Sequence, residues 1–228
     1  MQHRFVAGFF AFSCLSALGS PALADLAVDH SVGVKLLAGA DIWTTPDGLA
    51  DGDDGLGFRG NGGGMSYGAL AYYDLRLIKL IGLEAGLNYQ LGNMHRNVSV
   101  NGVDITEELE IQSLRLPLLA KLNVPLGLGR LWFGLGPEFT LSQSAEGHAE
   151  GGGQDADYPI REVKPMFLTF GTGLVIDVPG VGLEIPVEFR GSKNLDQPGD
   201  YLDRTEGERL RAESSWVLRL GAGLGVSF

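Results

Sequence analysis

Few residues of this 228-residue sequence have the types and spacing that catalysis needs. His95 and Ser99 lie four positions apart, and a histidine beside a serine can activate the hydroxyl for acyl transfer. His148 is followed by Ala149 and Glu150, so no serine lies two positions after it to form such a pair. We interpret these histidines, with His30, as solvated side chains, and the sequence predicts no catalytic residue.

One acidic segment has the oxygen ligands that calcium prefers, Asp51-Gly52-Asp53-Asp54-Gly55, but lacks the twelve-residue loop ending in a bidentate glutamate. The glycine triplets 62–64 and 151–153 have no strand–loop–helix unit around them, so they are not phosphate cradles. We expect no metal site and no cofactor. Whether the Asp51 segment takes a divalent cation stays open.

The first 24 residues read as a secretory signal peptide. A basic start at Arg4 precedes the apolar stretch 5–19, and the small residues Ala22-Leu23-Ala24 follow. Cleavage after Ala24 would remove the single cysteine, Cys14, which leaves no cysteine-based zinc site. We therefore expect residues 1–24 to be removed and residues 25–228 to form one domain.

Composition excludes two classes of protein. The chain has 28 acidic and 17 basic residues, whereas a nucleic-acid binder needs a basic face. Hydrophobic residues make up 44% of the sequence, too many for a disordered chain. Glycine is also unusually frequent, with 35 residues, and the fold must account for it.

The domain repeatedly alternates apolar residues with small or charged ones. In the last segment Trp216, Leu218, Leu220 and further apolar residues occupy every second position up to Phe228. This period of two predicts strands with one apolar face. We expect eight strands, at residues 32–42, 66–77, 83–91, 114–124, 131–139, 166–176, 183–189 and 216–228.

The second face of these strands carries glycines and charges of both signs. Its basic members are Lys35, Arg76, Arg115, Lys121, Arg190 and Arg219. Its acidic members are Asp41, Asp74, Glu84, Glu138, Asp177, Glu184 and Glu188. Such a nearly balanced set suits an enclosed ionic network. The apolar face would then contact lipid, with interface aromatics at Tyr67, Tyr73, Tyr89, Phe139, Trp216 and Phe228.

Long and short connections alternate between these strands. Long ones are expected at 46–63, 92–108, 142–163 and 191–213, and short ones at 79–82, 125–130 and 179–181, with a tight turn at Asn101-Gly102. The long connections hold 18 acidic and 7 basic residues, so most of the negative charge lies in them. Short periplasmic turns and long outer loops are typical of outer-membrane barrels.

Three motifs resemble a known family. Residues 112–122 read QSLRLPLLAKL, residues 132–138 read WFGLGPE, and residues 184–191 read EIPVEFRG. This series resembles the middle and the seventh strand of the small bacterial outer-membrane β-barrel family, whose members are OmpA/OmpX-like or PorT-like. The terminal Phe228 resembles that family's signal for the barrel-assembly machinery. The resemblance implies fold and export, and hardly any specific function.

We therefore expect an all-β protein, an eight-stranded antiparallel up-and-down transmembrane β-barrel in the cell outer membrane. Its expected role is structural or interactive, through acidic outer loops whose ligand is unknown, with a filled lumen and no wide, porin-like pore. Expected partners are outer-membrane lipid, lipopolysaccharide and the assembly machinery. One alternative is a rim-sited lipid A-modifying enzyme using His95 and Ser99. Another is a soluble, lipocalin-like periplasmic carrier.

Overall fold

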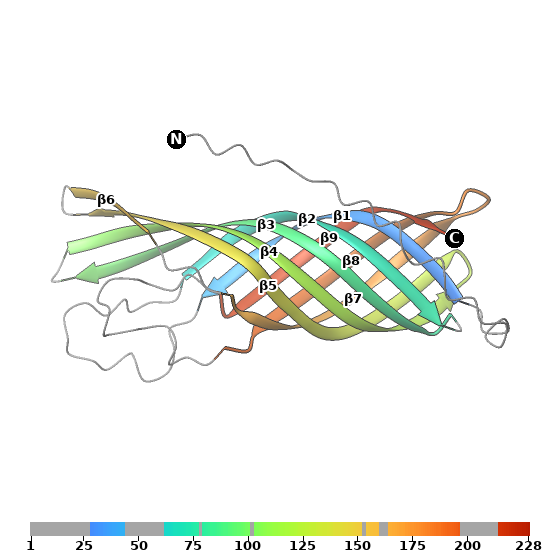
Figure 1. Ribbon diagram of the computed structural model, residues 1–228. Coiled ribbons are helices and arrows are strands. Elements are labelled where there is room, and N and C mark those ends of the chain that lie inside the picture. The colour runs from blue at the N-terminus through green and yellow to red at the C-terminus, as the bar shows by residue number, and fades with distance from the viewer. Residues whose placement is uncertain are drawn as a thin grey trace, which may run out of the picture.

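The computed structural model describes residues 28–43, 62–77, 79–100, 103–151, 154–159, 164–196 and 214–228. In these ranges the chain forms nine strands, all in one sheet (Figure 1). They are β1 (Val28–Trp43), β2 (Gly62–Leu77), β3 (Ile81–Val100), β4 (Val103–Leu126), β5 (Gly129–Gly151), β6 (Gln154–Pro159), β7 (Met166–Val178), β8 (Leu183–Asn194) and β9 (Trp216–Ser227). No helix in the described ranges is long and apolar enough to cross a membrane.

Eight of the described strands close into a barrel, as predicted. The strand order is β4-β3-β2-β1-β9-β8-β7-β5-β6, and an additional pairing of β4 with β5 joins the two ends. Every pairing is antiparallel. The first and last strands are tied at the rim, where His30 and Phe228 exchange backbone hydrogen bonds of 3.1 and 3.0 Å. Closure leaves no free edge around the barrel.

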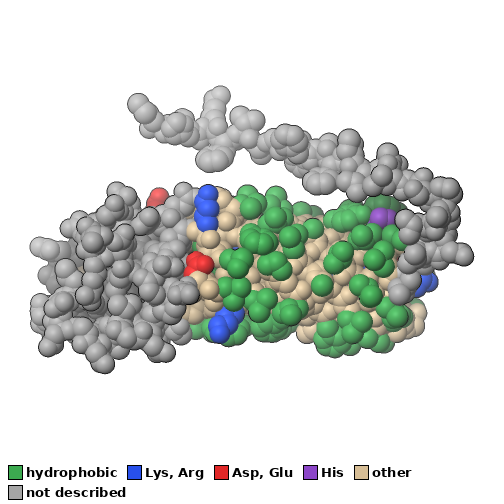
Figure 2. All heavy atoms as spheres, turned by 60° about the horizontal axis from the view of Figure 1, so that its bottom comes forward, with side chains coloured by type: hydrophobic (Ala, Val, Ile, Leu, Met, Phe, Trp, Pro, Cys, Tyr) green, Lys and Arg blue, Asp and Glu red, His purple; other side chains and the backbone are tan. Residues whose placement is uncertain are grey.

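The two faces of the barrel wall are chemically opposite. Apolar side chains point outward, and Leu36 and Leu220 are 71% and 66% exposed. Charged side chains point inward, and Lys35 and Glu138 are 1% and 0% exposed. Figure 2 shows the apolar side chains spread over the outer wall. A soluble carrier would place its apolar residues inside, so the observed distribution of side chains is the opposite of the one that this alternative predicts.

An apolar outer wall around a charged interior requires a lipid surrounding, and closed barrels satisfy every backbone group inside a bilayer. The protein is therefore an outer-membrane barrel, and its connections give the orientation. Short turns near residues 79–80, 127–128 and 179–182 lie at one end, which by this architecture faces the periplasm. The predicted interface aromatics lie on the outward face: Tyr67, Tyr73, Tyr89, Phe139 and Phe228 are exposed, and Trp216 is half-buried.

Three strands continue well beyond the length that a bilayer needs. β3, β4 and β5 have 20, 24 and 23 residues, against about 9–11 for a spanning strand. The prediction of long connections at 92–108 and 142–163 was therefore wrong for most of their residues. Val100 pairs with Val103, and the predicted tight turn at Asn101-Gly102 lies outside the described residues.

The strand extensions escaped prediction for two physical reasons. Outside the bilayer no lipid selects apolar residues, so the alternation stops at the membrane boundary although the strand continues. In β5 the register also shifts: Leu114 pairs with Ser142, whereas Arg115 pairs with Thr140. The extra residue, Leu141, forms a β-bulge. Even-numbered residues of β5 face inward before it, and odd-numbered residues face inward after it. A strict period of two is lost at that point.

Glycines on the inward face make room for two large aromatic side chains. A Cβ on Gly173 would lie 2.7 Å from Trp132 Nε1, and a Cβ on Gly225 would clash with the Tyr72 hydroxyl. Trp132 has no exposed surface and Tyr72 is 7% exposed. These glycines are therefore needed for close approach inside a narrow barrel.

Candidate functional site

The lumen contains a central network of six charged residues. Glu84 accepts hydrogen bonds from Lys35 at 2.9 Å and Lys121 at 3.1 Å, and it also pairs with Arg190. Further contacts join Lys35 to Glu188 and Lys121 to Asp74. The members come from β1, β2, β3, β4 and β8, so the network ties opposite walls together. All six side chains are buried.

Aromatic rings fill the space beside the central network. The Lys121 ammonium lies 4.4 Å from the centre of the Trp132 ring, and the Lys35 ammonium lies 4.1 Å from that of Tyr72. Leu70 and Leu119 are also buried among the inward residues. An eight-stranded barrel is just wide enough for side chains to fill it, and here they do.

An outer network surrounds Glu138. Its carboxylate accepts hydrogen bonds from Arg219 at 3.1 Å, Thr169 at 2.8 Å and Ser192 at 3.2 Å. Arg115 approaches it to 3.6 Å and stacks over the Phe167 ring. These contacts neutralise a carboxylate that has no exposed surface.

A third network lies near the periplasmic end. The Arg130 guanidinium binds both oxygens of Glu184, at 2.9 and 3.0 Å, in a bidentate pair. Arg76 donates to the same carboxylate at 3.1 Å, and Arg130 also contacts Asp177 at 3.3 Å. The lumen is thus crossed by charge pairs along most of its length.

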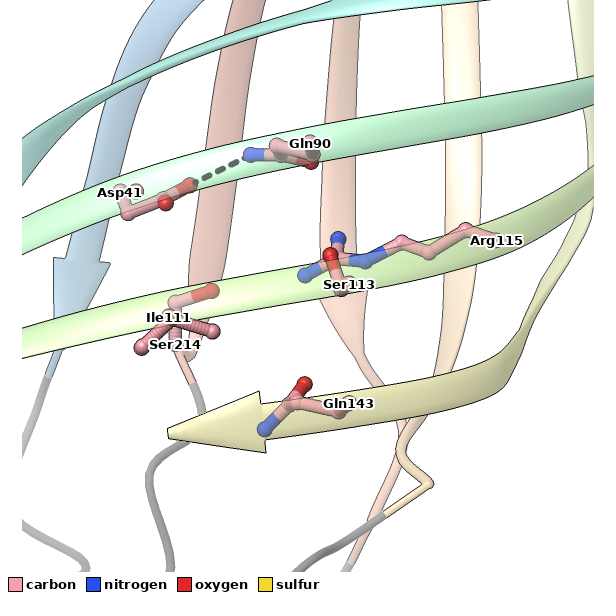
Figure 3. A pocket seen from close by; sticks show the side chains of 8 residues that line it. Asp41, Gln90, Ile111, Ser113, Arg115, Gln143 and Ser214 are labelled. Atoms are coloured by element: carbon pink, nitrogen blue, oxygen red, sulfur yellow. Dashed lines mark hydrogen bonds between the residues drawn. The ribbon is translucent and has the colours of Figure 1, made fainter. Parts of the chain in front are cut away.

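A small pocket opens at the outer end of the lumen (Figure 3). Its lining is polar, with Asp41, Gln90, Ser113, Arg115 and Gln143 among the members. Gln90 donates a long hydrogen bond of 3.5 Å to Asp41. The polar lining and small size suit ordered water better than an organic ligand.

The lumen prediction is largely confirmed. All six predicted basic residues and six of the seven acidic ones are buried inside the barrel. Asp177 is the exception, because its side chain is 50% exposed at the periplasmic rim. Arg130, assigned to a turn by sequence, is instead buried in the lumen. Arg130 lies two residues before the inward-facing Trp132, so the period of two would have predicted that it faces inward as well.

The extended strands form a second candidate site, which we call the outer sheet: residues 93–100, 103–110, 146–151 and 154–159. It projects beyond the other strands (Figure 1). Met94 and Leu109 on its inward face are each 3% exposed. Its outward face is polar and carries exposed carboxylates at Glu108, Glu110, Glu146, Glu150 and Asp157. No lysine or arginine lies among its described outward residues.

The register places outward residues of the outer sheet in rows across the strands. Glu110 stands directly opposite Glu146. In the next row His95 pairs with Glu108, Glu108 with His148, and His148 with Asp157. The hydrogen-bonded strands are about 4.8 Å apart, so each row is a compact line of functional groups.

The structure does not bring His95 and Ser99 together as a nucleophilic pair. Both lie on β3, where four residues span about 13 Å. His95 instead contacts Glu108 at 3.3 Å, and His30 lies at the opposite rim, stacked on Phe228. Of the two glycine triplets, 62–64 begins β2, and Gly151 ends β5. The Asp51 segment, residues 1–24 and residues 152–153 lie outside the described residues.

No protein-family model matches the chain, and neither does any curated protein. Solved structures show a weak likeness, among them the following three. The attachment invasion locus protein Ail of Yersinia pestis has 14% identity and a TM-score of 0.41, over 87% of this chain and 98% of that one. Neisserial surface protein A has 12% identity and a TM-score of 0.38, over 88% and 97%. The NalP translocator domain of Neisseria meningitidis has 9% identity and a TM-score of 0.40, over 94% and 90%.

Proposed function

We propose that this outer-membrane barrel is an interaction protein that uses the outer sheet to bind a cationic partner outside the cell. The observation that carries the proposal is the row in which Glu110 faces Glu146 across β4 and β5. Like charges directly opposite on a sheet destabilise the pairing. A partner with lysine or arginine side chains would relieve that repulsion, so binding and sheet stability would rise together.

The exposed carboxylates of the outer sheet are concentrated on its outward face. Glu108, Glu110, Glu146 and Glu150 are all exposed on the outward face, while Met94 and Leu109 are buried on the inward face. A surface with one sign of charge attracts an oppositely charged partner from a distance and orients it. The apolar barrel wall below serves as the membrane anchor.

A lysine-rich peptide is a suitable probe of this surface. The full chain in detergent micelles should bind it saturably at low salt, and added salt should weaken binding. The double variant Glu110→Gln/Glu146→Gln should weaken binding about tenfold. Asp177→Asn removes an exposed carboxylate at the periplasmic rim and should leave binding unchanged. Undiminished binding by the double variant would refute this role.

The proposal also holds that the lumen is closed to solutes. It is supported by the three charge networks and by Trp132, which has no exposed surface. Planar-bilayer recordings of the purified protein should show no stable conductance of porin size. Such a conductance would overturn the closed lumen while leaving the outer sheet's role intact.

Biogenesis forms a further part of the proposal. We expect residues 1–24 to direct export and be removed, so N-terminal sequencing of the membrane protein should begin at Asp25. Phe228 is 72% exposed and directly follows the last strand, β9, as a signal for the assembly machinery would. Phe228→Ala should lower the yield of assembled barrel, whereas Phe139→Ala in the wall should not.

A further inference from the structure

The row His95, Glu108, His148 and Asp157 alternates imidazole and carboxylate across four strands. Two contacts pair its members: His95 Nδ1 lies 3.3 Å from Glu108 Oε1, and His148 Nδ1 lies 2.6 Å from Asp157 Oδ1. All four side chains are exposed on the outward face of the outer sheet. This alternation goes beyond what a generally acidic surface requires.

The spacing within the row suits a metal ion. Glu108 lies between the two histidines, because β4 pairs with β3 on one side and β5 on the other. The Cα atoms of His95 and His148 are therefore about 10 Å apart, twice the strand spacing. Two imidazole side chains can span that distance and meet an ion above Glu108.

The carboxylate paired with His148 also defines which of its ring nitrogens would bind. Metal-bound histidines commonly donate the other ring N–H to a carboxylate, which fixes the tautomer and the ring orientation. In His148 the nitrogen beside Asp157 is Nδ1, so Nε2 is the ligand atom in such an arrangement. Asp157 would act as a positioning residue.

We propose that His95, Glu108 and His148 bind one divalent transition-metal ion on the outer sheet. Two imidazoles and one carboxylate suit zinc, nickel or copper, whereas calcium and magnesium prefer oxygen ligands alone. Among the described residues no three such side chains already converge on one point. Binding therefore proceeds with rotation of exposed side chains, and the neighbouring Glu110 and Glu146 attract the cation.

The ion would join three strands that are otherwise held by backbone hydrogen bonds. It would cross-link β3, β4 and β5 at the level where Gly63 of β2 still pairs with His95 and where the pairing of β7 with β5 has already ended. This inference does not depend on a cationic protein partner. It assigns a separate ligand to the same face.

Zinc titration of the full chain in detergent tests the site, with calcium in excess to occupy sites made of carboxylates alone. Wild type should take up one zinc ion per chain. His148→Ala should weaken binding at least tenfold, and His95→Ala/His148→Ala should abolish it. The matched control His30→Ala removes a histidine at the opposite rim and should bind as wild type does.

A second readout reports the ligand atoms. Cobalt should give a visible absorption spectrum typical of nitrogen and oxygen ligands, and Asp157→Asn should shift this spectrum and weaken binding. Absence of zinc uptake in calcium would overturn the proposal. Equal uptake by the double histidine variant would overturn it as well, because the acidic residues alone would then hold the ion.

Discussion

The ammonium group of Lys121 lies 4.4 Å from the centre of the Trp132 ring, and both side chains are buried in the lumen. The Trp132 ring therefore contacts the Lys121 cation and also fills the lumen. Cation–π contacts strengthen when both groups are removed from water. The same side chains thus fill the lumen and compensate its buried positive charge.

Trp132→Ala should open the lumen and destabilise the barrel. Loss of a fully buried aromatic side chain costs about 3–5 kcal/mol in a packed interior. Unfolding in urea and planar-bilayer recording would measure the lower stability and a raised conductance. Trp216→Ala, which removes a half-buried ring from the outer wall, should leave the conductance unchanged. Equal conductance of both variants would show that Trp132 does not block the path.

Glu84→Gln should be among the most destabilising substitutions in the lumen. The carboxylate contacts Lys35, Lys121 and Arg190, and its loss leaves these three buried cations with only two carboxylates, Asp74 and Glu188. Breaking a buried pair in this way costs about 3–5 kcal/mol. Equilibrium unfolding in lipid vesicles would measure it.

Asp177→Asn is the matched comparison for Glu84→Gln, because its half-exposed carboxylate contacts Arg130 at the rim. It should cost less than about 1 kcal/mol. If the two variants were equally stable, the central network would not hold the barrel together.

Leu36→Arg should destabilise the membrane-inserted state. Leu36 is 71% exposed near the middle of β1, and an arginine facing lipid near the midplane costs about 2–4 kcal/mol. Thr106→Arg, exposed on the outer sheet, should cost little. In a water-soluble carrier Leu36→Arg would be harmless, so a neutral result would contradict the lipid-facing wall.

Fractionation provides a test at the level of the whole protein. The native chain should be recovered with the outer membrane and should require detergent for extraction. Its gel mobility should change on boiling, because a closed barrel resists detergent until heated. Recovery in the soluble periplasm without a heat-dependent shift would contradict the membrane location.

The barrel could be predicted from sequence because lipid imposes a strict rule on each strand. Every second residue from Trp216 to Phe228 is apolar, and the same constraint identified the inward charges. The rule depends on the environment and not on the strand itself. It therefore failed at Asn93 and beyond, where β3 leaves the bilayer but keeps its pairing.

The row of histidines and carboxylates was missed for a different reason. His95, Glu108, His148 and Asp157 are far apart in sequence and show no spacing motif. Their alignment depends on the registers of three strand pairs and on the bulge at Leu141, which sets the parity of β5. Only the register places them in one line.

β4 runs from the periplasmic turn to the tip of the outer sheet, 24 residues that span about 80 Å. A load applied at the tip would therefore act along the strand and across its hydrogen bonds with β3 and β5. Many backbone bonds would share that load in shear instead of breaking one after another. The outer sheet would therefore transmit such a load directly to the barrel wall in the membrane.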